Sequence, residues 1–202
     1  MRTIDADLTA EAEKYVVSLL NNRLSEEYLF HSVRHTMNVV KGAELIGKES
    51  GLNESELKIL KISALFHDVG YTITNEDHEA ESAFIAGEFL RSKEVDEDQM
   101  KQVENAIMAT RVPQQPKDRI SGVLCDADLL HLTSEDYFEQ MELLRLEWQV
   151  TGKNFFTEYQ FHQNSLDFFK GHHYHSEYGR KVLEARKQIV LMKIRDRMEE
   201  LE

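Results

Sequence analysis

The sequence contains a single cysteine, Cys125, in 202 residues. One thiol cannot form an intramolecular disulfide, and it cannot supply the several thiolates of a structural zinc site. The first residues lack a basic stretch followed by an apolar one, and no apolar run approaches the roughly 20 residues that span a bilayer. We therefore expect a cytoplasmic protein without a membrane partner.

Backbone-breaking residues are also scarce. The chain has only two prolines, Pro113 and Pro116, and nine glycines, which is too few for a β protein with many turns. Apolar residues instead recur every three or four positions, as in Ala12, Val16 and Leu19. This pattern predicts an all-α fold of about nine helices. The expected spans are 6–21, 34–49, 54–68, 78–92, 97–110, 120–132, 134–151, 155–169 and 177–200.

No linker, internal repeat or low-complexity segment divides the chain. Its length suits one domain, given the roughly 100 to 200 residues that are usual for one. We expect a single domain over 1–202, with its core at about 28–180 and an amphipathic C-terminal helix at 181–202. That helix could pack on its own domain or could form a homodimer with a second copy.

Small and polar residues mark several expected helix boundaries. Gly51 and Gly70 follow the second and third helices as C-caps, and Ser134 could cap the start of the seventh. Asp77 could cap the helix that begins near His78.

Positive charge is in deficit. Lys and Arg total 24 against 37 Asp and Glu, which gives a formal net charge of -13. An acidic surface repels the phosphate backbone of DNA and RNA, so a long nucleic acid is not an expected partner. A small phosphorylated substrate remains compatible, because a bound cation and a few local bases can reverse the field inside one pocket.

One histidine and one aspartate stand together at the end of a buried helix. Leu60, Ala64 and His67 are spaced along one helical face, and Asp68 borders its apolar side. A carboxylate isolated from water costs several kcal/mol or becomes protonated. A cation would remove that cost, although the pair could also cap helices or hydrogen-bond in a polar core patch.

Two further segments offer similar residues. His35 precedes Val39 at helical spacing, so its imidazole lies on an apolar face, where an ordinary core histidine would also fit. Asp126 and Asp128 fall in the apolar run 123–132 and are hard to explain as a solvated face.

Two imidazoles and two carboxylates form a mixed nitrogen and oxygen ligand set. Such a set suits a first-row divalent ion better than calcium, and Mn, Fe, Co, Ni and Mg are all admissible. Open coordination positions would allow a bound water to be acidified while a phosphoryl oxygen is polarised. These are the two requirements of phosphoester hydrolysis.

The order of His35, then His67 and Asp68, then Asp128, all on helices, resembles the HD-domain metal-dependent phosphohydrolase superfamily, and the small stand-alone predicted phosphohydrolases within it most of all. The resemblance implies a compact helical bundle around one buried metal cleft. It also implies that these four residues are the metal ligands, with Asp126 as the fallback. The matching segments, between about residues 28 and 180, are HSVRHTMNVV, ALFHDVGY, HEAES and CDADLL.

The same resemblance sets limits. HDVGY lacks the extended motif of the cyclic-dinucleotide phosphodiesterase branch, so that substrate is not implied. Dinuclear relatives have two more histidines, of which His78 has a match while the region around Thr110 has none, so we expect one metal. Similarity in the segment HHYHSEYGR implies that His172, Tyr174 and Arg180 belong to the pocket wall.

Other polar residues could act on a substrate beside these ligands. His78 shares an inward face with Ser82, and His31 precedes His35 by one helical turn, so each could contact the substrate or transfer a proton. Capping is an equally ordinary role for His78. The cations that could hold a phosphate are Arg34, Arg111 and Lys117, although a solvated loop would explain the last two.

These observations predict a metal-dependent phosphohydrolase that cleaves a small phosphoester, with a nucleotide as the favoured class. Asp68 would position or deprotonate the water, and His78 or His31 would balance charge on the substrate. The alternative is a non-catalytic sensor that binds metal and nucleotide in the same cleft. Oxygen-dependent chemistry at a di-iron site, known for a few relatives, would need more ligands than the sequence offers.

Overall fold

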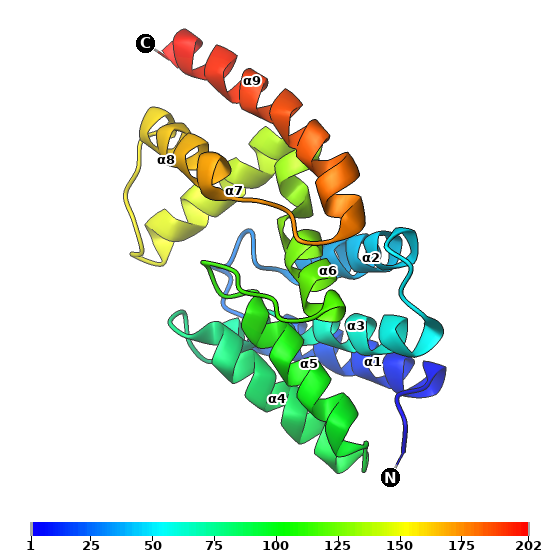
Figure 1. The fold of residues 1–202 in the computed structure, drawn as a ribbon. Coiled ribbons are helices and arrows are strands. Elements are labelled where there is room, and N and C mark those ends of the chain that lie inside the picture. Colours follow the sequence, from blue (N-terminus) through cyan, green and yellow to red (C-terminus); the bar gives the residue numbers. More distant parts are fainter. Residues whose placement is uncertain (1, 202) are drawn as a thin grey trace.

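The computed structural model describes residues 2–201 and is all-α over that range, as the sequence predicts (Figure 1). Nine α-helices lie within those residues, whereas Arg2 and Val95 form only an isolated β-bridge. The helices are α1 (Ala6–Arg23), α2 (Val33–Glu49), α3 (Glu54–Phe66), α4 (His78–Ser92), α5 (Glu97–Ala109), α6 (Arg119–Asp128), α7 (Tyr137–Val150), α8 (Glu158–Gly171) and α9 (Glu184–Leu201). Among them, none is long and apolar enough to cross a membrane.

Two expected boundary signals behave differently from each other. The C-cap of α2 is Ser50, and Gly51 is the next residue, with a left-handed φ of 72°, the conformation in which a glycine commonly follows a helix. Ser134 does not start α7. Its hydroxyl donates to the carbonyl of His131 and closes a short 3₁₀ segment, η2 (Leu129–Thr133), while Asp136 precedes the first residue of α7.

Gly70 is needed for a reason other than a C-cap. It lies in a second 3₁₀ segment, η1 (Val69–Thr72), which is separated from the end of α3 by two residues. A Cβ atom at this position would lie 2.0 Å from the carbonyl oxygen of His78. The absent side chain therefore allows η1 and the start of α4 to touch.

Two hydrophobic clusters hold the helices together. The first joins residues of α1 to α6, which occupy the lower part of Figure 1. The second joins α7, α8 and α9 with Phe30 and Leu132, and its helices lie above the first group in that view. Helix α6 and η2 lead from one cluster to the other, and the residues that could bind metal lie beside this connection.

Candidate metal centre

The four residues predicted as ligands come together from three places where a helix begins or ends. His35 is in the first turn of α2, and His67 and Asp68 are the two residues that follow α3. Asp128 is the last residue of α6. The chain changes from α to 3₁₀ geometry directly after Asp68 and again after Asp128, so the carboxylates sit at the helix ends.

Their side-chain atoms face one another at close range. Nε2 of His35 lies 3.3 Å from Asp68 Oδ2 and 3.3 Å from Asp128 Oδ1. Nε2 of His67 lies 3.2 Å and 3.5 Å from the same two oxygens, and the two Nε2 atoms are 3.3 Å apart. Ligand atoms of His35, His67 and Asp128 all lie within 4.8 Å of one another, the spacing of a group that could hold a metal ion.

The hydrogen bonds around this group fit a cation. Nδ1 of His67 lies 2.8 Å from the carbonyl of Ala64, and a carbonyl only accepts, so Nδ1 carries a proton. In the neutral ring, Nε2 would therefore present a lone pair to the centre. Oδ2 of Asp68 is fully buried, and among residues 2–201 it faces the two imidazole nitrogens without a hydrogen bond of good geometry. A divalent ion would satisfy both the buried oxygen and the opposed imidazole nitrogens.

Charge coupling within the group is strong. Burial alone would lower the pKa of each imidazole, but the carboxylates of Asp68 and Asp128 outweigh it, so the pKa of His35 is raised and that of His67 is raised well above its ordinary value. Burial would likewise raise the pKa of Asp68 and of Asp128, yet the two histidines hold both below their usual range. Without a metal, protons on the imidazoles supply the positive charge that the carboxylates require.

His78 and His31, predicted to act on the substrate, both lie beside this centre. Nε2 of His78 is 3.6 Å from Asp68 Oδ1, and its ring stacks on Tyr71 at a centroid distance of 3.9 Å. The ring of His31 also contacts Tyr71, with centroids 4.4 Å apart, and lies 6.4 Å from the ring of His78. Burial lowers the pKa of His78 in spite of the Asp68 and Glu79 carboxylates.

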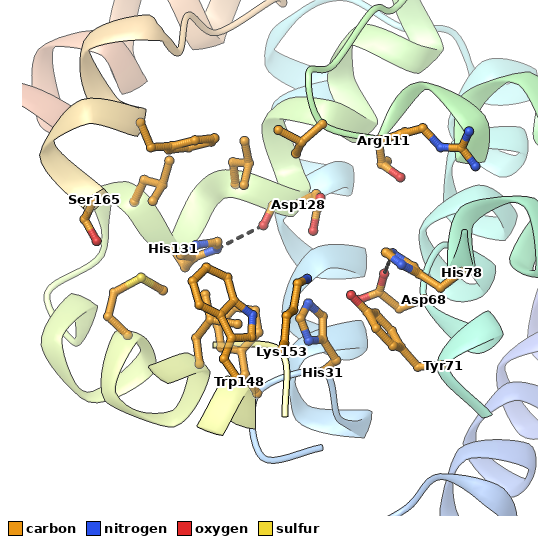
Figure 2. A pocket seen from close by; sticks show the side chains of 18 of the residues that line it. His31, Asp68, Tyr71, His78, Arg111, Asp128, His131, Trp148, Lys153 and Ser165 are labelled. Atoms are coloured by element: carbon orange, nitrogen blue, oxygen red, sulfur yellow. Dashed lines mark hydrogen bonds and ion pairs between the residues drawn. The ribbon is translucent and has the colours of Figure 1, made fainter. Parts of the chain in front are cut away.

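A cavity of about 540 Å³ opens from the centre toward α7 and α8. Figure 2 shows Asp68, Tyr71 and His78 on one side of it and Trp148 and Ser165 on the opposite side. Its volume lies within the roughly 300 to 1,000 Å³ of small-molecule sites. A ligand in this cavity can therefore touch the metal-binding residues and the α7–α8 pair at once.

Of the predicted phosphate-binding cations, only Arg111 lines this cavity. Its guanidinium is paired with Asp77 at 2.8 Å and with Glu79 at 3.5 Å, so Asp77 serves as its partner and makes no side-chain cap to α4. Arg34 is absent from the cavity lining because it is exposed and pairs with Asp136 at 3.5 Å.

Lys117 and Arg180 lie elsewhere. Both line a separate cavity of about 570 Å³ between the loop before α6 and the segment before α9. Lys117 follows the loop that contains Pro113 and Pro116, and its place in this second cavity is away from the metal centre. Arg180 donates to the carbonyl of His175. Their predicted contact with the substrate is therefore not supported by their positions.

His172 and Tyr174 lie one layer behind the cavity. The ring of His172 stacks on Phe168, which does line the cavity, at 5.6 Å. The hydroxyl of Tyr174 donates to the carbonyl of Leu129, another lining residue, at 3.2 Å. Both residues are buried and support the wall from outside.

Asp126, the fallback ligand, is hydrogen-bonded in another direction. Its Oδ1 accepts from the backbone N–H of His175 at 2.7 Å, and its Oδ2 accepts from that of Ser176 at 2.8 Å. A Cβ atom on Gly179 would lie 2.1 Å from Oδ2, so only glycine allows this approach. Asp126 thus anchors the segment that leads into α9.

Four residues in the cavity wall or directly behind it were not among the candidates drawn from the sequence: His131, Glu147, Trp148 and Lys153. Glu147 is a buried carboxylate that accepts from the backbone N–H groups of Phe30 and His31 and lies 2.5 Å from Nδ1 of the His31 ring. Its position in the apolar stripe of α7 was the available signal, although Glu147 itself stands behind His31 and not in the lining.

His131, Trp148 and Lys153 complete the missed set in the cavity wall. Nδ1 of His131 lies 3.0 Å from the carbonyl of Asp128, and burial lowers the pKa of this histidine to about 4, so the ring is neutral. Its spacing of one turn from Asp128 was a usable signal. The Nζ atom of Lys153 lies 5.3 Å from the centroid of the Trp148 ring. Nothing in the sequence marks this loop lysine.

The fold and the opposed histidines and aspartates define an all-helical protein with a buried site suited to a divalent metal. The HD domain family model matches residues 33–133, half of the chain. The protein belongs to the HD domain family.

Solved structures agree with this assignment. A predicted HD superfamily hydrolase from an uncultured Thermotogales bacterium is 19% identical, with a TM-score of 0.63 over 94% of this chain and 92% of that one. A Lactobacillus plantarum protein is 15% identical, with a TM-score of 0.70 over 98% of this chain and 99% of that one. At these identities the likeness concerns the fold. No curated protein sequence matches the chain.

Proposed function

We propose that this protein is a metal-dependent phosphohydrolase that cleaves a small phosphoester in the cavity beside His35, His67, Asp68 and Asp128. The observation that carries the proposal is the buried Oδ2 of Asp68, which lies within 3.3 Å of two imidazole nitrogens but has no hydrogen bond of good geometry from the described residues. These four residues would hold one divalent cation, of which Mn, Fe, Co, Ni and Mg are candidates. When bound, it supplies Lewis acidity, which polarises a phosphoryl oxygen and makes water a stronger acid.

The chain's own groups would manage the proton and the substrate. Asp68 Oδ1 faces His78 Nε2 at 3.6 Å, so a water beside Asp68 could pass its proton toward this imidazole. Because Glu147 binds Nδ1 of His31, the other edge of that ring is left for the cavity. Lys153 and the partly paired Arg111 are the cations that could attract the phosphate.

A nucleotide is the favoured substrate within this class, and the net charge of -13 argues against a long nucleic acid. A cytoplasmic location and a homodimer formed through α9 also remain predictions. The competing function is a sensor that binds metal and nucleotide without turnover. The paired His78 and Asp68 favour the enzyme, because a binding module has no need of a proton acceptor beside the ligand set.

The test is metal analysis of protein purified without added metal, followed by phosphatase and phosphodiesterase assays with each candidate ion. The wild type should hold about one ion per chain. His67→Ala and Asp68→Asn should each lower metal affinity and activity by more than the roughly 10- to 100-fold typical of groups that only support a ligand. His173→Ala, at an exposed position, is the matched control.

Three results would decide among the functions. Metal binding with no turnover on any phosphoester would support the sensor. Activity that survives His67→Ala or Asp68→Asn would place the reaction at a different site. Activity in protein free of iron would exclude oxygen-dependent di-iron chemistry.

A further inference from the structure

The end of the cavity remote from the metal-binding residues is lined by apolar and aromatic side chains. Six of these residues, from α7 and α8, form what we call the aromatic chamber: Met141, Leu144, Trp148, Phe161, Phe168 and Phe169. These side chains offer no group that would bind a phosphate. The same cavity therefore presents, beside Asp68 and Asp128, an apolar surface suited to another part of the ligand.

The side chains of the chamber are packed in place in the absence of a ligand. Its back wall, which includes Phe161 and Phe169, is 2–3% exposed and belongs to the second hydrophobic cluster. Trp148 and Phe168 are half-buried and carry the accessible aromatic surface. The Trp148 ring packs on Phe161 with centroids 5.4 Å apart, so it is held in place before any ligand arrives. Pre-ordered aromatic surface binds flat rings at little entropic cost.

Few polar groups interrupt this surface. Ser165 lines the chamber, but its hydroxyl already donates to the carbonyl of Phe161. Asn164 provides one amide, and Lys153 lies beside the Trp148 ring, with both labelled in Figure 2 near His31. The chamber thus suits a neutral ring, while charge is accommodated nearer the metal-binding end.

We propose that the aromatic chamber binds a flat ring carried by the leaving group, so that the substrate class is a phosphomonoester of a ring-bearing alcohol. The inference rests on the proposed function. In the reaction, water oxygen bonds to phosphorus, the bond from phosphorus to the ester oxygen breaks, and the ring-bearing alcohol leaves with a proton. The ring could be a nucleobase or a simple aryl group, which share the same stacking chemistry.

Binding can be measured apart from turnover, because Trp148 is the only tryptophan in the chain. We would titrate 4-nitrophenol, adenosine and glycerol into metal-free protein in EDTA and follow tryptophan fluorescence. At least one ring-bearing alcohol should quench Trp148 saturably, and glycerol should not. Phe168→Ala, which keeps the fluorophore, should weaken that binding by about tenfold or more. Phe155→Ala, at a residue that is 73% exposed and outside the cavity lining, should not.

Turnover gives the second readout. The metal-loaded enzyme should have at least about tenfold higher kcat/KM for 4-nitrophenyl phosphate or adenosine 5′-monophosphate than for glycerol 3-phosphate. Ser165→Phe, checked for folding by circular dichroism, should fill the chamber and lower kcat/KM for the ring substrates alone. The preferred ring substrate identifies the aryl or the nucleoside source.

The two proposals fail in different ways. Saturable quenching of Trp148 with no turnover of any phosphoester would overturn the proposed function, and the chamber would then stand as a ring-binding site without a leaving group. Equal turnover of all three esters, with no quenching and no effect of Phe168→Ala, would overturn the chamber's role while the phosphohydrolase stands.

Discussion

His35 and His67 present their Nε2 atoms to each other at 3.3 Å, with the carboxylates of Asp68 and Asp128 beside both. Two unprotonated nitrogens so close would repel, and two protonated ones would repel more strongly. The carboxylates decide the balance and raise the pKa of both histidines in the metal-free protein. A divalent ion must therefore displace protons from the site in order to bind.

Metal affinity should consequently rise with pH. The raised pKa values of His35 and His67 mean that protons compete from above pH 6.5 downward, and the loss should approach about tenfold per pH unit for each proton displaced. Calorimetric titration with Mn²⁺ in two buffers of different ionisation enthalpy would count the protons released. Affinity that stays constant between pH 8 and pH 6, with no proton release, would contradict this account.

At the residue scale, the sequence predicted best where a polar residue interrupts an apolar helical face. His35, His67 and Asp128 were found in this way, and the structure brings them together as a group that could hold a metal. Lys153 could not be found, because its place in the cavity depends on how α7 and α8 pack. Asp126 and Asp128 lie on different faces of α6, but nearly every residue of this helix is buried. Periodicity therefore could not show which of the two carboxylates faces the imidazoles.

Among elements, the junction of η1 and α4 sets the position of His78 relative to Asp68. Gly70 donates its N–H to the Ser82 hydroxyl and leaves room for the carbonyl of His78. A methyl group here would meet backbone, at 2.0 Å from that oxygen, and backbone cannot move aside without shifting the start of α4.

Gly70→Ala should therefore lower both stability and activity. Overpacking of this kind costs about 1–3 kcal/mol in free energy of unfolding, and displacement of His78 should lower kcat more than metal content. Urea unfolding and metal analysis would measure the two effects. Gly171→Ala is the control, because a Cβ there meets nothing within 4 Å. Equal stability and activity of both variants would refute the close-approach role of Gly70.

The remaining differences between the expected and the observed helices lie at the helix boundaries. Periodicity placed the first eight helices within four residues of their observed bounds, while the ninth, expected from 177, starts only at Glu184, after a π-helical segment, η3 (Gly179–Leu183). The eighth helix, α8, begins at Glu158 and not at 155. Thr157 and Gln160 form a capping box there, and this reciprocal pair of hydrogen bonds fixes the start. The expected start at 155 includes Phe155 and Phe156, which lie before the N-cap Thr157. The periodicity of apolar residues does not show where a cap ends the helix.

At the scale of the whole molecule, the cavity takes its apolar wall from the second hydrophobic cluster, with Phe30, Tyr137 and Phe161 among its members. The opposite, polar wall is formed by residues at the ends of helices of the first group, such as Asp68, His78 and Asp128. The expectation of one domain over 1–202 stays a prediction. Such a domain requires contacts that join the two hydrophobic clusters. Besides the continuous chain through α6 and η2, a major tie is the carboxylate of Asp126, which binds the backbone of residues 175 and 176 ahead of α9.

Asp126 and Asp128 should accordingly give opposite results when replaced by alanine. Asp126→Ala leaves the N–H groups of His175 and buried Ser176 without their acceptor, which should cost about 2 kcal/mol or more in free energy of unfolding, with metal retained. Asp128→Ala removes an oxygen that faces both imidazoles, so it should abolish metal binding while changing the stability of the metal-free protein less. Urea unfolding in EDTA and metal analysis of both variants would compare them directly. If Asp126→Ala lost the metal and kept its stability, Asp126 would be the ligand, and the segment before α9 would need another anchor.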